Sequence, residues 1–129
     1  MRMFAEESWQ KMKQTEHDEQ VKLFQWAKLQ SSKHPHLSMM FAIPNGGQRN
    51  IVTATKLKAE GVKSGVPDIF LAFPSQGFHG LFIEMKSSKG RLSENQVEWK
   101  DKLLANEYDW RVCYSFSEAQ KEIMEYLDI

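Results

Sequence analysis

Two short apolar runs joined by a brief connection constrain the fold of this chain more than any other feature. The first run covers residues 69–73 (IFLAF) and the second covers 81–86 (LFIEMK). Each has the length of one β-strand, and the turn-forming segment 74–79 separates them. Because so short a connection joins neighbouring strands, the pattern predicts an antiparallel pair at the centre of a sheet.

The rest of the chain alternates between helix and strand signals. A first helix is expected to begin at Thr15 or Asp18, since Thr15-x-x-Asp18 resembles a capping box and Leu23 and Ala27 follow at helical spacing. Further helices are predicted over 50–60 and from capping boxes at 93–96 and 117–120, and further strands over 39–43 and 111–114.

These elements follow the order α-β-α-β-β-α-β-α. That order predicts an α/β fold, with one mixed β-sheet flanked by helices. A length of 129 residues allows a single core. We therefore expect one domain over residues 1–129, with 1–14 as a less ordered N-terminal segment.

Composition places the chain among ordinary globular proteins, with 41% hydrophobic and 26% charged residues. No stretch approaches the roughly 20 consecutive apolar residues that a membrane-spanning helix needs, and the first residues lack the apolar stretch of a signal peptide. The single cysteine, Cys113, excludes an internal disulfide. We expect no membrane association and a reducing cytoplasmic location, in a bacterial cell or a virus-infected host.

Charge is balanced overall and unbalanced locally. The chain has 17 basic and 17 acidic residues, yet segment 49–63 carries four cations against one acid, and segment 86–91 carries three cations. Both ends are acidic. A basic middle is compatible with nucleic-acid contact on one face. The alternative is a solvated surface with chance clustering of charge.

Three ionisable residues flank the two predicted central strands. Glu84 and Lys86 are two residues apart on one strand, so their side chains project from the same face with Cα atoms ~6.6 Å apart. Antiparallel pairing brings Asp68, which precedes the first strand, beside them. Two carboxylates can hold a hard divalent cation, Mg²⁺ or Mn²⁺, and a nearby amine can orient a water that attacks a phosphodiester.

The tripeptide Glu-x-Lys alone is a weak signal, because Glu98-Trp99-Lys100 also matches it. Residues two apart on a helix point in nearly opposite directions, so that second pair cannot form one site. The strand context selects Glu84 and Lys86. The alternative to a catalytic site is that Asp68 is a turn residue at the start of its strand and that Glu84 and Lys86 form an ion pair on an exposed face.

With its flanks, this pattern resembles a known family. The pattern Pro67-Asp68…Glu84-x-Lys86 is similar to the PD-(D/E)xK nuclease signature. The segments 44–49 (PNGGQR), 57–68 (LKAEGVKSGVPD) and 84–99 (EMKSSKGRLSENQVEW) resemble the virus-type replication-repair nuclease (VRR-NUC) domains. The resemblance covers about residues 15–128 and implies a restriction-endonuclease-like fold in stand-alone form.

The resemblance also implies a set of site residues. In the family the corresponding positions bind Mg²⁺ or Mn²⁺, which assigns Asp68, Glu84 and the backbone carbonyl of Met85 as metal ligands. Lys86 would serve the attacking water. Two further residues have alternatives. Gln96 either assists the water or lysine or serves only in the capping box, and the first-helix ligand is expected to be Glu19, with Glu16 as the competitor.

A third set of residues is expected to contact DNA phosphates without reading sequence. These candidates are Asn45, Gly46, Gly47, Arg49, Lys58, Lys63, Lys89 and Arg91. For the glycines, plain turn chemistry is an equal explanation. No GxxxxGK[ST] pattern occurs, so no nucleotide cofactor is expected.

Together these features predict a Mg²⁺- or Mn²⁺-dependent DNA endonuclease of repair or recombination. The resemblance to stand-alone members implies a four-way (Holliday) junction resolvase, and the two-fold symmetry of that substrate favours a homodimer. Flaps, nicks or plain duplex are alternative substrates. A catalytically silent module that binds branched or duplex DNA and a small dimeric scaffold within a repair complex are the alternative functions.

Overall fold

The computed structural model describes the backbone of residues 2–44 and 51–129. Helix α1 comes first, and a short 3-10 helix, η1, leads from it into the first strand. The elements in chain order are α1 (Arg2–Gln30), η1 (Pro35–Met39), β1 (Met40–Ala42), α2 (Ile51–Ala59), β2 (Ile69–Leu71), β3 (Leu81–Met85), α3 (Glu94–Ala105), β4 (Asp109–Cys113) and α4 (Phe116–Leu127).

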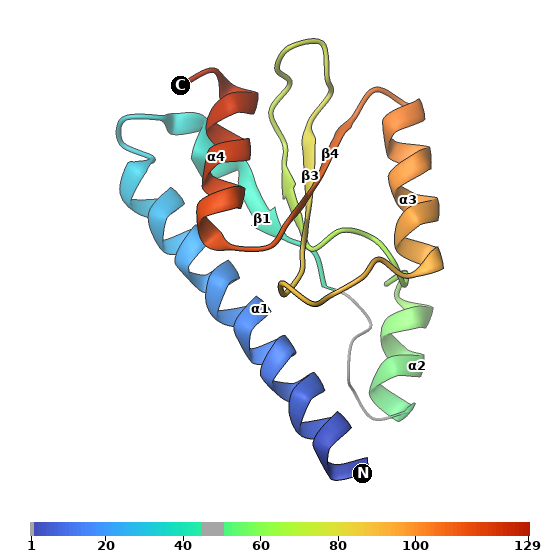
Figure 1. The fold of residues 1–129 in the computed structure, drawn as a ribbon. Helices are drawn as coiled ribbons and strands as arrows, with labels where there is room; N and C mark the ends of the chain where they lie inside the picture. The colour runs from blue at the N-terminus through green and yellow to red at the C-terminus, as the bar shows by residue number, and fades with distance from the viewer. Residues whose placement is uncertain (1, 45–50) are drawn as a thin grey trace.

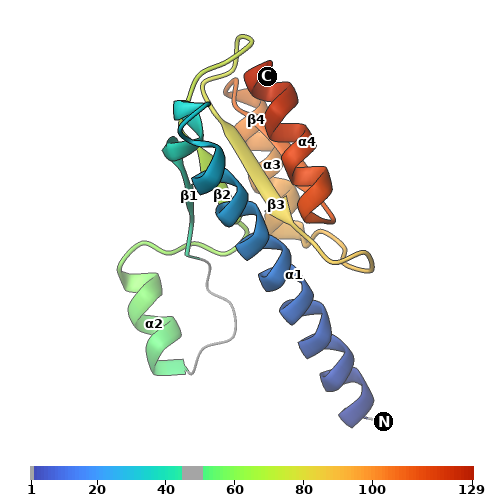
Figure 2. The same ribbon diagram turned by 90° about the vertical axis from the view of Figure 1, so that its left-hand side faces the viewer.

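The four strands form one mixed sheet in the order β1-β2-β3-β4. Strand β2 pairs antiparallel with both β1 and β3, whereas β3 and β4 are parallel. Helices α1 and α4 lie on one side of the sheet and α3 lies on the other (Figures 1 and 2). The predicted α/β class, the element order and the antiparallel central pair are confirmed.

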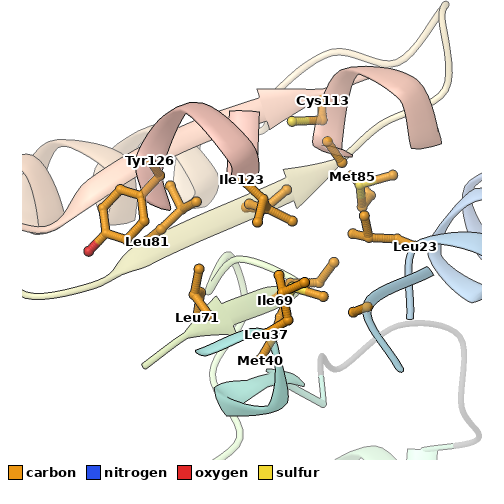
Figure 3. Close-up of a cluster of buried hydrophobic side chains, with 13 residues drawn as sticks. Leu23, Leu37, Met40, Ile69, Leu71, Leu81, Met85, Cys113, Ile123 and Tyr126 are labelled. Carbon is orange, nitrogen blue, oxygen red and sulfur yellow. The ribbon is translucent and has the colours of Figure 1, made fainter. Parts of the chain in front are cut away.

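The main hydrophobic core lies between the sheet and helices α1 and α4 (Figure 3). Alternate residues of β2 and β3 point into it, and Ile69 and Ile83 are completely buried there. Leu23 of α1 and Ile123 of α4 meet them from the helical side and are also completely buried. Burial of one such aliphatic side chain contributes about 1.5–3 kcal/mol to the free energy of unfolding. Because this core occupies one face of β2 and β3, the opposite face is left for other residues.

The first helix begins earlier than its capping signals predict. Helix α1 runs continuously from Arg2, and Thr15 lies inside it, where its hydroxyl donates a hydrogen bond to the backbone carbonyl of Lys11. The predicted start at Thr15 or Asp18 is therefore wrong. A threonine hydroxyl inside a helix can donate a hydrogen bond to a backbone carbonyl of the preceding turn. A sequence that resembles a cap can therefore lie in the middle of a helix.

The last helix is also capped earlier than predicted. Ser115, not Ser117, accepts the hydrogen bond from the backbone N–H of Glu118, so α4 begins at Phe116. Strand β4 begins at Asp109, two residues before the predicted start. These shifts leave the element types unchanged.

Strand β1 is shorter and more open than predicted. It covers Met40–Ala42 within the predicted 39–43, and only Met40 is buried. Phe41 is 49% exposed, because β1 is an edge strand and its second face is not packed like its first. The apolar run 39–43 predicts a short buried strand; the strand is confirmed, and the predicted burial is wrong.

Helices α2 and α3 expose several of their apolar residues. Helix α2 buries none of its side chains. On α3, helical spacing predicts an inner face of Val97, Trp99, Leu103 and Leu104; Leu103 is buried, whereas Val97 and Leu104 are exposed. Among the described residues, no helix has the length and apolarity needed to cross a lipid bilayer.

Gly65 fixes the loop before β2 against the first turn of α3. It has a positive φ of 89°, and a Cβ atom there would lie 2.6 Å from the backbone carbonyl carbon of Asn95. We expect Gly65→Ala to lower the free energy of unfolding by about 3 kcal/mol, since overpacking adds to backbone strain. Urea denaturation of the purified variant measures this loss.

Gly61→Ala is the matched control. Gly61 also has a positive φ, of 99°, but nothing lies within 4 Å of the Cβ position. Its substitution should cost only the left-handed strain, about 1 kcal/mol. Equal losses in the two variants would contradict the packing of this loop against α3.

Candidate active site

The sheet register places Asp68 beside the end of β3. Ile69 is the partner of Ile83 in the antiparallel pair, so the preceding residue, Asp68, lies opposite Glu84. The backbone N–H of Met85 donates to Asp68 Oδ2 at 2.8 Å. The main chain of β3 therefore holds the carboxylate of Asp68 at the point where Glu84 and Lys86 begin.

Glu84 is a buried carboxylate with one satisfied oxygen. Its side chain is 4% exposed, and Lys86 Nζ lies 4.0 Å from Oε1. Gln96 Nε2 donates to the same oxygen at 2.6 Å. The other oxygen, Oε2, is buried and has no hydrogen-bond partner among the described residues. A buried unpartnered carboxylate oxygen is costly unless a proton or a cation satisfies it.

The electrostatics of the site agree with this geometry. Burial raises the pKa of Glu84 from 4.5 to about 8, and the neighbouring carboxylate of Asp68 adds to the rise. Lys86 opposes it, while Glu16 raises the pKa further. Lys13 lowers the pKa as well, but the two lysines do not offset burial and the neighbouring carboxylates, so at neutral pH Glu84 is mostly protonated when no cation is present.

Gln96 serves both the helix cap and the site. The side-chain Oε1 of Gln96 accepts a hydrogen bond of 2.8 Å from the backbone N–H of Ser93. The backbone N–H of Gln96 donates to Ser93 Oγ at 3.2 Å, which completes the capping box of α3. Its Nε2 remains available for Glu84. The two roles weighed for Gln96 are therefore compatible, because they use different atoms of one amide.

On α1 the structure brings Glu16, and not Glu19, to the end of β3. Glu16 Oε1 accepts a hydrogen bond of 3.1 Å from the backbone N–H of Ser87. Glu19 lies within 3.6 Å of Lys22 on its own helix. A single sequence could not separate these two acids, since they are one helical turn apart and both border the stripe that contains Leu23.

The candidate DNA-contacting residues divide into two sets. Lys58, Lys63, Lys89 and Arg91 are all solvent-exposed. Lys58 lies on α2 and Lys63 follows it, while the other two lie in the connection from β3 to α3. The remaining candidates, Asn45, Gly46, Gly47 and Arg49, lie outside the described residues.

Ser87 belongs to the site and was not predicted from the sequence. It is 5% exposed, and its hydroxyl has no hydrogen-bond partner within the described part of the chain. Its backbone N–H is the donor to Glu16. A serine after a Glu-x-Lys tripeptide carries no motif of its own, so only the packing of α1 against β3 identifies it.

The residues present fit a hard cation in one specific way. Among the described side chains, no three His, Cys, Asp or Glu residues form a ready metal-ligand cluster. The site offers instead a pair of carboxylates, Asp68 and Glu84. Among the described residues, Oε2 of Glu84 has no hydrogen-bond partner. Mg²⁺ is usually bound by only one or two carboxylates and keeps several of its water ligands, so a carboxylate pair suits it.

A mixed four-stranded sheet flanked by helices, with this carboxylate pair and lysine at the end of two adjacent strands, is a restriction-endonuclease-like α/β fold. The sequence pattern of the VRR-NUC domain matches residues 5–117. The chain belongs to the VRR-NUC domain family, which confirms the predicted resemblance.

Two further comparisons agree. A solved structure described as a VRR_NUC domain protein is 27% identical, with a TM-score of 0.75, and 88% of each chain is covered. A Fanconi-associated nuclease 1 homolog from Schizosaccharomyces pombe (strain 972 / ATCC 24843) is 35% identical over 78 residues, which is 60% of this chain. The matched region is 11% of that relative's length.

Proposed function

We propose that this protein is a metal-dependent DNA endonuclease that hydrolyses phosphodiester bonds. The observation that carries the proposal is the buried, unpartnered Oε2 of Glu84 beside Asp68 and Lys86. Membership of a nuclease family supports it. A purely structural carboxylate in such a place would be expected to have both oxygens satisfied.

Asp68, Glu84 and the backbone carbonyl of Met85 are the groups that would hold Mg²⁺ or Mn²⁺. Such an ion, when bound, lowers the pKa of a water ligand and neutralises charge on the phosphate. Lys86, whose Nζ lies 4.0 Å from Oε1 of Glu84, orients the attacking water and stabilises the negative charge that develops on the phosphate oxygens. Gln96 keeps Oε1 of Glu84 engaged, so that Oε2 would be the oxygen available to the ion.

We assign Glu16 as the acid of α1 that supports the metal site. Glu16→Gln should reduce cleavage by about 10- to 100-fold, as loss of an outer carboxylate typically does. Glutamine can still accept the hydrogen bond from Ser87, so the fold should be unaffected. Steady-state cleavage rates at several Mn²⁺ concentrations measure the effect.

Glu19→Gln is the matched control for that substitution and should stay within about twofold of the wild type, since its partner is a surface lysine. The reverse ranking of the two variants would return the assignment to Glu19.

For the substrate, we propose branched DNA in repair or recombination, with a four-way junction cut by a homodimer as the first form to test. Two-fold symmetry of the junction favours two sites related by symmetry. The exposed lysines of α2 and of the β3–α3 connection support sequence-independent phosphate contact. The single, buried Cys113 favours a reducing compartment such as the cytoplasm.

Labelled four-way junction, flap, nicked and plain duplex DNA incubated with the protein and Mg²⁺ or Mn²⁺ tests the proposal. Cleavage should disappear with EDTA and in Lys86→Ala. Lys100→Ala, in the second Glu-x-Lys tripeptide on α3, should cleave normally because residues two apart on a helix cannot form one site and Lys100 lies over the ring of Trp110. Binding without cleavage under every metal would favour the silent DNA-binding module.

A further inference from the structure

The register of the sheet places one aromatic residue from each strand in a single row. Phe41 of β1 is the partner of Phe70, Phe70 is the partner of Phe82, and Phe82 is the partner of Trp110. Residues directly opposite one another in a sheet project from the same face. Four aromatic side chains therefore cross the whole sheet at one level, which we call the aromatic row.

Three rings of the aromatic row, those of Phe41, Phe70 and Phe82, are in contact. Phe70 and Phe82 stack with centroids 4.3 Å apart, and Phe41 meets Phe70 edge to face at 5.8 Å. Gly80 makes room for this arrangement, since a Cβ atom there would lie 2.5 Å from the ring of Phe70. The row is therefore a packed structure that holds its rings in place.

The aromatic row lies on the same face as the candidate active site. Ile69 and Ile83 point into the main core, so their strand neighbours project from the opposite face. Asp68 and Phe70 are two residues apart on one strand, as are Phe82 and Glu84. Phe70 and Phe82 are thus each ~6.6 Å from the carboxylate on their own strand, one side-chain repeat away, and Phe41 lies beside Phe70 on the next strand.

One end of the row is open. Trp110 is 8% exposed at the β4 end, where Lys100 of α3 lies over its ring. Phe41 is 49% exposed at the β1 end. Helices α1 and α4 lie on the other side of the sheet and do not cover this end of the row (Figure 2).

We propose that the open end of the aromatic row, formed by Phe41 on Phe70, binds an unstacked nucleobase of the DNA strand that is cut. The inference rests on the proposed nuclease function, because a phosphate at Asp68 and Glu84 places an adjacent base within reach of these rings. Aromatic side chains accept any base by stacking. The site therefore selects DNA in which a nucleotide near the cut is free of its duplex stack, as at a branch point.

A nucleobase fits this surface better than a protein partner. A stable protein interface buries about 800 Å² on each partner, whereas the aromatic row offers one half-exposed ring. A single base is comparable in size to that ring. The row also adjoins the carboxylates directly, so a large partner docked on it would cover the site that the DNA needs.

A cycle that combines a protein change with a DNA change tests the proposal. The affinity of wild type and Phe41→Ala is measured in EDTA, without cleavage, by fluorescence anisotropy of a labelled branched DNA. The same DNA is then prepared with abasic nucleotides at its branch point. We expect Phe41→Ala to weaken binding about tenfold on the base-bearing DNA and to cause no further loss on the abasic DNA. Phe41→Trp should retain wild-type affinity.

Leu29→Ala is the control, because Leu29 is a 77% exposed apolar residue of α1, on the opposite side of the sheet. It should bind both DNAs like the wild type. Equal loss by Phe41→Ala on base-bearing and abasic DNA would overturn the proposal. So would unchanged DNA affinity together with an altered sedimentation coefficient, which would assign the row to contact between copies. Cleavage with Mn²⁺ is read separately, so a protein that binds as expected but never cuts would refute the nuclease function alone.

Discussion

Asp68→Asn is expected to abolish DNA cleavage, by a factor on the order of 10³, while DNA binding stays unchanged or becomes tighter. The loss follows from removing one of the two carboxylates proposed to hold the cation, an interaction that would be worth several kcal/mol in the transition state. Binding is spared because the substitution removes a negative charge close to the phosphate. Single-turnover cleavage and anisotropy on the same junction DNA measure the two effects.

The structure indicates that Asp68→Asn removes the charge without changing the backbone around it. Asparagine retains a side-chain oxygen that can accept the 2.8 Å hydrogen bond from Met85, so the end of β3 should keep its geometry. Unchanged thermal stability is the control for folding. Normal cleavage by Asp68→Asn would show that the catalytic centre lies elsewhere.

Glu84→Gln is expected to abolish cleavage and, in EDTA at pH 9, to stabilise the fold by on the order of 3 kcal/mol. In the wild type, burial and the charge of Asp68 raise the pKa of Glu84 to about 8. A folded-state pKa above the unfolded one means that the native protein binds the proton more tightly. Stability from this group is therefore complete below about pH 4.5 and is lost as pH rises through 8.

Thermal denaturation of wild type and Glu84→Gln from pH 5 to pH 9 in EDTA measures the difference. The gap in Tm should be small at pH 5 and should grow up to pH 8, because glutamine has no proton to lose. The exposed carboxylate of Glu98 supplies the matched control, Glu98→Gln, which should change Tm by much less than Glu84→Gln does at pH 8. A constant gap for Glu84→Gln would contradict the raised pKa.

Much of this architecture could be predicted because the relevant signals are local. Apolar runs of strand length and a short connection predicted β2, β3 and their antiparallel pairing, and that pairing brings Asp68 opposite Glu84. The capping box at Ser93 was equally local and is present with both of its hydrogen bonds.

The remaining features depend on tertiary packing. Whether Glu16 or Glu19 reaches β3 is decided by how α1 rotates on the core, which the sequence of one helix does not specify. The exposure of Phe41 follows from the edge position of β1 in the sheet. The aromatic row itself requires the exact register of three strand pairs, since a shift of one residue would move each ring to the opposite face.

Gln96 both caps α3 and donates a hydrogen bond to Glu84. The geometry of the candidate site therefore depends on an intact first turn of that helix. Helix termini fray more readily than helix centres, and fraying of the first turn of α3 would withdraw the amide that engages Glu84. Amide-exchange protection at Gln96 therefore reports the fraction of molecules whose centre is assembled at any moment. Any contact that tightens this turn would raise that fraction without touching the reacting atoms.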